Sequence, residues 1–264
     1  MSLCAPAPGL SCFRCCPPLR PAGYDHADHR GPLRRLFSDN RAAFLRGELP
    51  RGPVVGFSCP GLGFLDSRGR TVGCLLHPAR NQGRDLRRLT GYAEKCARES
   101  CPQARAFAAL EPGEREALLE PCRGMDSFQF SSPRLNPLMR LLALGPGVAR
   151  AAAGLGPGGL RLEDLEPAWG WLLQGLIRVR GPEVLQAPDL AGRLGALARE
   201  LARRLGPFPP LERGVPLYRL ASEWEARFWQ RLSRARRCPA RELARWRDTL
   251  ARLLEEQKEK WGYN

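Results

Sequence analysis

The distribution of cysteine constrains this 264-residue chain more than any other feature of its sequence. Seven of the ten cysteines lie between residues 12 and 101, in short segments in which proline and glycine are frequent. Thiolate and imidazole groups bind zinc and iron, and turns bring closely spaced ligands to one ion. We therefore expect the first half of the chain to wrap around bound metal, with these candidate ligands: Cys12, Cys15, Cys16, Cys59, Cys74, His77, Cys96 and Cys101.

The spacing of these candidate ligands favours turns that serve one ion. Two residues separate Cys12 from Cys15 and Cys74 from His77, a gap that lets both side chains of a pair face one metal. Cys16 directly follows Cys15, so these two would more easily serve different ions. The ligands fit two four-coordinate sites, and they also fit one four-cysteine iron–sulfur cluster with the rest structural. The residue types do not separate zinc from iron, because both accept sulfur-rich tetrahedral surroundings.

A β-hairpin is predicted between Cys59 and Cys74. The chain would turn at Asp66 to Gly69, where glycine supplies the positive φ that ends such a turn. This hairpin would bring the two cysteines to neighbouring positions and so build half of a metal site.

Burial of cysteine as a small apolar residue is the competing interpretation. The density of cysteines in irregular, proline- and glycine-rich segments argues against it for the candidate ligands. We favour it for the three remaining cysteines, which are Cys4, Cys122 and Cys238.

Short elements are predicted for the rest of the first half. Apolar periodicity favours helices over 32–46, 84–98, 103–110 and 114–119, and extended segments over 54–57 and 125–133. Residues 32–46 would form one or two short helices, and Ser38 or Asp39 could cap the second turn. The helix over 84–98 would aim Cys96 inward, with Cys101 just beyond its end.

Helical periodicity takes over from about residue 134. Apolar side chains recur at helical spacing in four stripes, over 169–177, 190–205, 220–232 and 243–253, and we interpret the Gly- and Ala-rich stretch 145–159 as a connector. We expect a cysteine-cluster metal-binding region over 1–133 and a helical bundle over 134–264. The predicted fold is mainly α with a small irregular, hairpin-containing cysteine-rich half, and α+β overall.

The net charge of +15 raises the question of an anionic partner. Residues 218–254 hold ten arginines against four acidic residues, with Trp224, Trp229 and Trp246 interleaved. A nucleic-acid-binding protein with a structural zinc site is therefore one alternative. We favour the ordinary interpretation, a solvated basic face over an apolar stripe, with the helical half supplying a surface for an unknown protein partner.

Other function classes find little support in the sequence. It contains no GxGxxG motif after a strand, no Walker loop and no nucleophile elbow, so it indicates no substrate pocket. No apolar run approaches the roughly 20 residues that span a bilayer, and the N-terminal residues lack the pattern of a secretory signal. We expect no membrane partner and a cytoplasmic location, where thiols stay reduced and clustered cysteines bind metal more often than they form disulfides.

A family resemblance supports the metal interpretation. The chain resembles the YkgJ-type cysteine-cluster family of zinc- or iron-chelating proteins at three places: Cys12-x-x-Cys15-Cys16, Cys59-Pro60-Gly61-Leu62-Gly63-Phe64-Leu65-Asp66 and Gly73-Cys74. The resemblance covers roughly residues 9 to 101. Flagellin lysine N-methylases carry a related cluster, so an iron–sulfur-containing enzyme related to them is a further alternative.

The chain departs from this family's pattern at defined positions. Gly9 stands where the family's first knuckle cysteine would be, and His77-Pro78 takes the place of an Arg-Pro pair. The next cysteine follows only at Cys96. The resemblance thus implies metal chelation with a variant second half of the site, and it implies no particular reaction.

Overall fold

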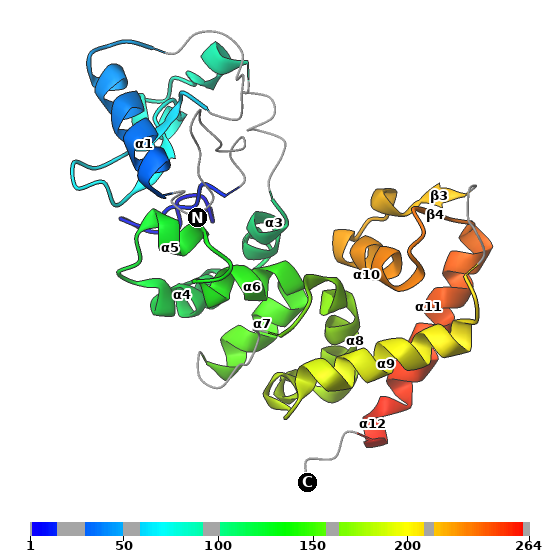
Figure 1. Ribbon diagram of the computed structural model, residues 1–264. Coiled ribbons are helices and arrows are strands. Elements are labelled where there is room, and N and C mark those ends of the chain that lie inside the picture. Colours follow the sequence, from blue (N-terminus) through cyan, green and yellow to red (C-terminus); the bar gives the residue numbers. More distant parts are fainter. Residues whose placement is uncertain are drawn as a thin grey trace. The chain divides into compact units, whose positions relative to one another are not determined.

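A computed structural model describes residues 2–14, 30–49, 59–91, 101–156, 164–208 and 214–260 (Figure 1). It divides into two compact units. Unit 1 comprises Met1–Ala108 and Cys122–Met139, and unit 2 comprises Ala109–Pro121 and Arg140–Asn264. Helices dominate the described residues, and the strands found there form two small antiparallel pairs. The fold is therefore mainly helical and of the α+β kind, as the sequence predicted.

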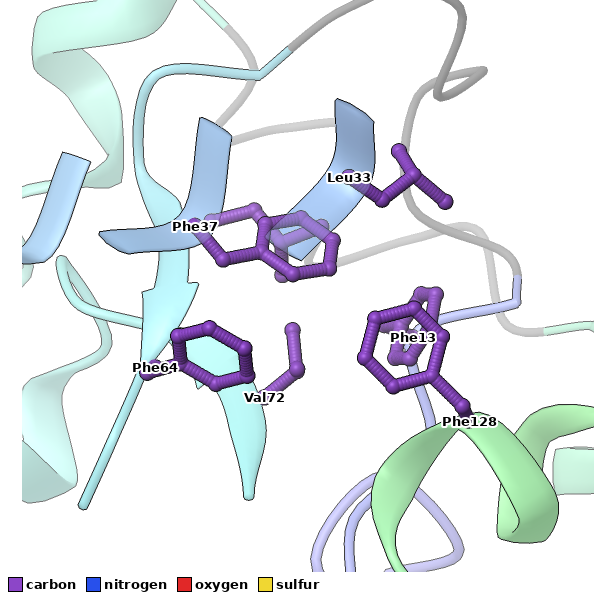
Figure 2. Packing of buried hydrophobic residues seen from close by; sticks show 7 residues of the cluster. Phe13, Leu33, Phe37, Phe64, Val72 and Phe128 are labelled. Carbon is purple, nitrogen blue, oxygen red and sulfur yellow. The ribbon is translucent and has the colours of Figure 1, made fainter. Parts of the chain in front are cut away.

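The core of unit 1 is an aromatic cluster built from segments far apart in the sequence (Figure 2). Helix α1 (Arg30–Leu45) contributes Leu33 and Phe37, which lie four residues apart and so share one helical face. The hairpin of β1 (Leu62–Phe64) and β2 (Val72–Cys74) packs beneath it. The Phe37 ring meets those of Phe13 and Phe64 edge-on at centroid distances of 5.5 and 5.7 Å, a favoured aromatic geometry.

Buried hydroxyl groups join three segments of unit 1 beside this cluster. The Ser11 hydroxyl donates a hydrogen bond to the Val72 carbonyl at 2.5 Å and lies 2.6 Å from the Ser127 hydroxyl. The Val72 N–H donates to the Ser127 oxygen at 2.9 Å, and the Phe13 N–H donates to the Ser131 oxygen at 3.0 Å. The N-terminal segment, β2 and α5 (Ser127–Ser131) are thus fixed to one another.

Helix α5 corrects the extended segment predicted over 125–133. Asp126 accepts a hydrogen bond from the Gln129 N–H at 2.8 Å, and the Gln129 side chain accepts one from the Asp126 N–H at 3.0 Å. This reciprocal capping box stabilises the first helical turn. The alternation of Phe128 and Phe130 with Gln129 suggested a strand, yet a short helix buries both phenylalanines and leaves Gln129 exposed.

Two further predictions for unit 1 are wrong in part. Residues 30–45 form one continuous helix, so Ser38 and Asp39 lie inside it and start no second turn. The helix predicted over 84–98 does not begin at residue 84. Residues Arg87–Thr90 form only a 3-10 turn, which Gly91 ends with a left-handed φ of 69°. The rest of that helix with Cys96, and the strand predicted over 54–57, lie outside the described residues.

The remaining short elements of the first half follow the predicted order. Helix α3 (Pro102–Ala108) and helix α4 (Pro112–Leu119) stand where helices were expected, and both begin at a proline, which suits the first helical position. Short 3-10 turns occupy Pro78–Arg80 and Glu120–Cys122. Helix α4 packs on α7 in unit 2, where Arg150 pairs with Glu114 at 3.2 Å. The chain therefore crosses between the units three times, whereas the sequence analysis placed one boundary, after residue 133.

The second half is helical, as predicted, and each apolar stripe lies largely on one helix. The helices are α6 (Pro137–Leu144), α7 (Pro146–Leu155), α8 (Gly170–Arg180), α9 (Leu190–Leu205), α10 (Glu223–Ser233), α11 (Ala240–Glu255) and α12 (Gln257–Lys260). Short 3-10 turns occupy Pro167–Trp169, Pro182–Gln186 and Leu217–Arg219. The strands β3 (Val215–Pro216) and β4 (Arg237–Cys238) pair antiparallel. Trp229 and Trp246, both fully buried, lie 5.4 Å apart at the centre of the packing.

Helix α7 corrects the connector predicted over 145–159. Gly145 and Gly156, both with positive φ, flank the helix, and Pro146 opens it. The alanines between them have the highest helix propensity of any residue. The glycines of this stretch therefore mark the ends of a helix that buries Val148, Ala149 and Ala152.

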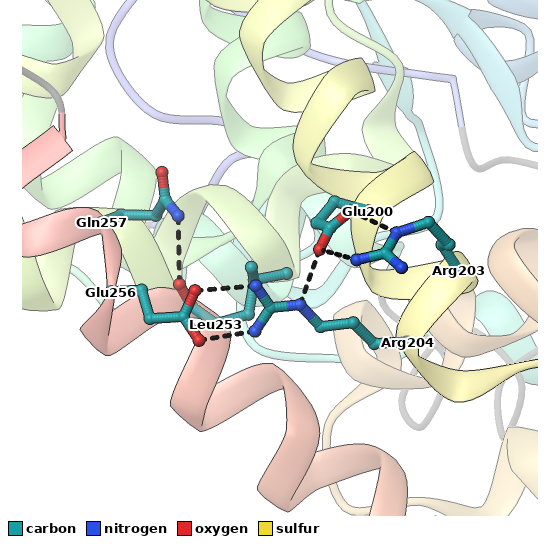
Figure 3. A network of polar contacts seen from close by, with 6 residues as sticks. All are labelled: Glu200, Arg203, Arg204, Leu253, Glu256 and Gln257. Atoms are coloured by element: carbon teal, nitrogen blue, oxygen red, sulfur yellow. Dashed lines mark hydrogen bonds and ion pairs between the residues drawn. The ribbon is translucent and has the colours of Figure 1, made fainter.

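A network of charged side chains ties the end of α9 to the end of α11 (Figure 3). Arg204 forms two hydrogen bonds with the Glu256 carboxylate, at 2.5 and 2.7 Å, and a third with Glu200 at 2.7 Å. Arg203 also pairs with Glu200. Hydrogen bonds from these two guanidinium groups lower the pKa of Glu200 to about 2. At its start, α12 is held by the Gln257 amide, which donates to the Leu253 carbonyl at 3.3 Å.

Among the described residues, no helix combines the length and apolar character that crossing a bilayer requires.

Candidate metal centre

The predicted hairpin is confirmed, and it places Cys59 and Cys74 at its open end. Leu62 pairs directly with Cys74, and Phe64 pairs with Val72. The Leu62 N–H donates to the Cys59 carbonyl at 3.0 Å, so Cys59 begins a tight turn that leads into β1. At the other end of the hairpin, Gly69 adopts the expected positive φ of 65°.

A second tight turn starts at the other cysteine of the hairpin. The His77 N–H donates to the Cys74 carbonyl at 3.4 Å, so the two-residue gap between these side chains is a turn, as the spacing predicted. Partial burial lowers the pKa of His77. The nearby guanidinium groups of Arg87 and Arg80 lower it as well, whereas the Asp85 carboxylate raises it. A lowered pKa favours the neutral imidazole, which is the form that binds metal.

Two asparagine side chains hold these turns. The Asn40 amide donates to the Leu62 carbonyl at 2.8 Å and to the Cys59 carbonyl at 3.4 Å. The Asn81 amide donates to the carbonyls of Leu75 and His77, both at 2.9 Å. Sequence reasoning missed both residues, because a side chain that binds the backbone of a distant turn leaves no local pattern. They orient the candidate ligands without being ligands themselves.

Close approach of α1 to the hairpin depends on Gly63. A Cβ at this position would meet the Phe37 carbonyl oxygen at 3.1 Å and the Arg41 nitrogen at 3.3 Å, both in the α1 backbone. It would also lie 2.8 Å from the Leu75 side chain. Glycine therefore lets α1 lie directly on β1, within reach of the turn that Asn40 holds.

Cys12 and Cys101 lie on other elements of unit 1. Cys12 is buried, and its N–H donates to the Cys4 carbonyl at 3.2 Å, so the structure brings the backbone of Cys4 to a candidate ligand. Cys101 precedes α3, where its sulfur accepts a hydrogen bond from the Ala104 N–H at 3.4 Å. Both residues therefore have defined structural positions in addition to their proposed role.

The described residues contain no group of three or more His, Cys, Asp or Glu side chains that could hold one metal ion. Cys59, Cys74 and His77 follow one another at the open end of the hairpin, and their thiol and imidazole groups are of the kind that binds zinc or iron, but their side chains do not form such a group. Three candidate ligands, Cys15, Cys16 and Cys96, lie outside the described residues. Binding of metal by the full set of eight ligands therefore stays a prediction.

Cys122 and Cys238 behave as packing residues, as predicted, whereas Cys4, for which burial was also predicted, is exposed. Both are buried, and burial raises the pKa of each thiol to about 11, with Glu242 adding to the effect on Cys238. Cys122 donates a hydrogen bond to the Asn136 side chain at 3.4 Å. A thiol that stays protonated at neutral pH is a poor metal ligand, because the thiolate is the binding form.

The three tryptophans once considered for nucleic-acid binding belong to the interior of unit 2. Trp229 and Trp246 are fully buried, and Trp224 is half-buried with its N–H donating to the Ala143 carbonyl at 3.2 Å. Trp229 and Trp246 therefore cannot stack on bases. The apolar stripes are therefore core, as the sequence analysis held.

Comparison of the chain with protein-family models, with curated proteins and with solved structures gave no match.

Proposed function

We propose that unit 1 is a metal-binding module in which Cys59, Cys74 and His77 contribute ligands to a zinc or iron–sulfur site. The remaining ligands would come from the other candidates of the cysteine-rich half, which are Cys12, Cys15, Cys16, Cys96 and Cys101. The cellular role of such a module would lie in holding this half folded for a partner, or in electron transfer if the metal is an iron–sulfur cluster.

One observation carries the proposal: two cysteines begin tight turns at the open end of one hairpin. Each strand of this hairpin has only three residues, and an isolated two-stranded hairpin is marginal in water. Metal bound at the open end would fix the two turns relative to each other. Its binding free energy would add to that of the aromatic cluster in stabilising unit 1.

The test is purification of the full chain without oxygen, followed by metal analysis and a visible absorption spectrum. A colourless protein with zinc would indicate a structural site. Iron with sulfide and broad visible absorption would indicate a cluster, and would favour the alternative of an iron–sulfur enzyme. A protein that contains none of these metals, and takes up neither zinc nor iron on reconstitution, would contradict the proposal.

Matched serine variants separate ligands from packing cysteines. We expect Cys59→Ser and Cys74→Ser to lower the bound metal per chain. Cys122→Ser is the control, because Cys122 is buried in the same unit, and serine can keep the hydrogen bond to Asn136. Equal metal content in all three variants would show that the hairpin cysteines are not ligands of the metal.

A further inference from the structure

A small arginine-rich surface surrounds the strand pair of unit 2. We call the segments 214–222 and 234–241 together the arginine ribbon. β3 pairs with β4 in the register Val215 with Cys238 and Pro216 with Arg237. The Leu217 N–H donates to the Arg236 carbonyl at 3.0 Å, which continues the pairing by one step. The backbone pairing therefore holds the two segments side by side, although the 11 residues of α10 separate them along the chain.

The two paired segments concentrate positive charge. They contain no aspartate or glutamate and hold five exposed arginines, namely Arg219, Arg234, Arg236, Arg237 and Arg241. Within the described part of the chain, none of the five forms an ion pair with a carboxylate. Like charges held close together repel one another, so the cluster lowers stability unless an anion binds there.

Many arginines on the neighbouring helices, in contrast, form ion pairs with glutamates. Arg227 pairs with Glu223, Arg245 with Glu242, and Arg247 with Glu225. Arg231 pairs with Glu166, and Arg203 and Arg204 pair with Glu200. The positive charge of residues 218–254 is therefore largely neutralised along the helices and concentrates on the ribbon.

An exposed aromatic ring lies within this positive surface. Tyr218 keeps 68% of its surface exposed, and the Arg219 guanidinium carbon lies 5.9 Å from the centre of its ring. Val215 is also exposed, at 39%. An exposed ring on a positively charged surface is the combination by which proteins bind single-stranded nucleic acid, since bases stack on the ring and phosphates pair with basic side chains.

Local contacts hold the ribbon in place before any ligand binds. Arg234 takes a left-handed φ of 57°, and its N–H donates to the Gln230 carbonyl at the end of α10. The Ser233 hydroxyl donates to the Trp229 carbonyl and accepts from the Ala235 N–H. Gly214 packs so closely that a Cβ would lie 2.5 Å from the Cys238 carbonyl group. Such preorganisation reduces the entropy lost on binding.

We infer that the arginine ribbon is a binding site for single-stranded nucleic acid, with the five arginines on phosphates and Tyr218 stacked on a base. A double helix fits less well, because its bases are already stacked and offer no free face to Tyr218. The inference is independent of the metal proposed for unit 1, since the ribbon belongs entirely to unit 2.

The experiment is a fluorescence anisotropy titration of the full chain against a labelled 20-nucleotide single strand of mixed sequence. Five phosphate contacts predict a loss of affinity of about 100-fold between roughly 50 and 200 mM salt. Arg236→Gln combined with Arg237→Gln should reduce this loss to about 20-fold, because two counterions fewer are released. Tyr218→Ala should weaken binding by roughly 5- to 150-fold at fixed salt, the usual value of one stacked base.

Arg203→Gln is the matched control, because it removes one exposed arginine that already has a carboxylate partner. It should leave the affinity nearly unchanged. Circular dichroism and the melting temperature should show that each variant is folded, since all the altered side chains are exposed.

Four results would overturn the inference. The first is affinity that barely changes with salt, or no binding at low salt. The second is equal loss of affinity in Arg203→Gln and in the ribbon variants, which would indicate attraction by net charge alone. The third is equal affinity for a duplex with no effect of Tyr218→Ala. Phosphatidylserine-containing vesicles are the competing anion, and ribbon-dependent binding to them without binding to the single strand would also exclude a nucleic-acid site.

Discussion

Unit 1 and unit 2 both bury aromatic and aliphatic side chains, but they join their segments in different ways. In unit 1 a few side chains connect places far apart in the sequence, as Ser127 does between Ser11 and Val72. In unit 2 long amphipathic helices pack along stripes, and ion pairs such as Arg204 with Glu256 add to that packing. Stability in unit 1 therefore depends on single residues, whereas in unit 2 it is distributed over many contacts.

The largest loss of stability is expected when one central ring is removed from each unit. Phe37→Ala and Trp246→Ala each delete a fully buried side chain, and each should cost about 3–5 kcal/mol of unfolding free energy. We expect hydrogen exchange to accelerate together in α1, β1, β2 and α5 of Phe37→Ala, because one cluster joins them. In Trp246→Ala the acceleration should be strongest in α9, α10 and α11.

Exchange confined to α1 in Phe37→Ala would break the comparison, since it would mean that the hairpin and α5 persist without the central ring. Mass spectrometry of peptic fragments reports each segment separately and uses the full chain.

A smaller effect is expected from the buried hydroxyl at residue 127. Ser127→Ala leaves the Val72 N–H without its acceptor and removes a partner of the Ser11 hydroxyl. An unsatisfied buried polar group costs about 1–3 kcal/mol, to be measured by urea unfolding. Ser132→Ala is the control, because its hydroxyl accepts only an exposed hydrogen bond from the Leu135 N–H, at 3.3 Å. Equal losses in the two variants would show that the hydroxyl contacts do not set the stability of unit 1.

The smallest expected effect is electrostatic and belongs to unit 2. Arg203 and Arg204 lower the pKa of Glu200 to about 2, below its ordinary value. The carboxylate therefore adds stability above its unfolded pKa of about 4.3, and this stability disappears as the pH falls toward 2. Exposed pairs contribute little and are screened by salt, so the change should be slight.

The measurement compares melting temperatures of the wild-type chain and Glu200→Gln between about pH 5 and pH 2.5 at low salt. The wild-type advantage should shrink as the pH falls. An advantage that stays constant over this range would mean that the carboxylate of Glu200 titrates as in the unfolded chain.

Local sequence patterns predicted the elements whose cause is local. The stripes of 190–205 and 243–253 became α9 and α11, since spacing of three and four residues places apolar side chains on one helical face. The hairpin was predictable because its turn requires a residue with positive φ, and glycine at position 69 adopts it readily. Of the candidate metal centre, the turn between Cys74 and His77 and the adjacency of Cys59 to the hairpin were predictable in the same way.

Long-range contacts decided the rest. Phe128 and Phe130 suited a strand as well as a helix, and burial of both rings on α5 decided for the helix that the capping box starts. The strands β3 and β4 have two residues each, too few to leave an alternating pattern. Sequence alone established which residues carry thiols and positive charge. Tertiary structure decided which arginines have carboxylate partners and which remain on the ribbon, because pairing depends on distances between helices that no local pattern contains.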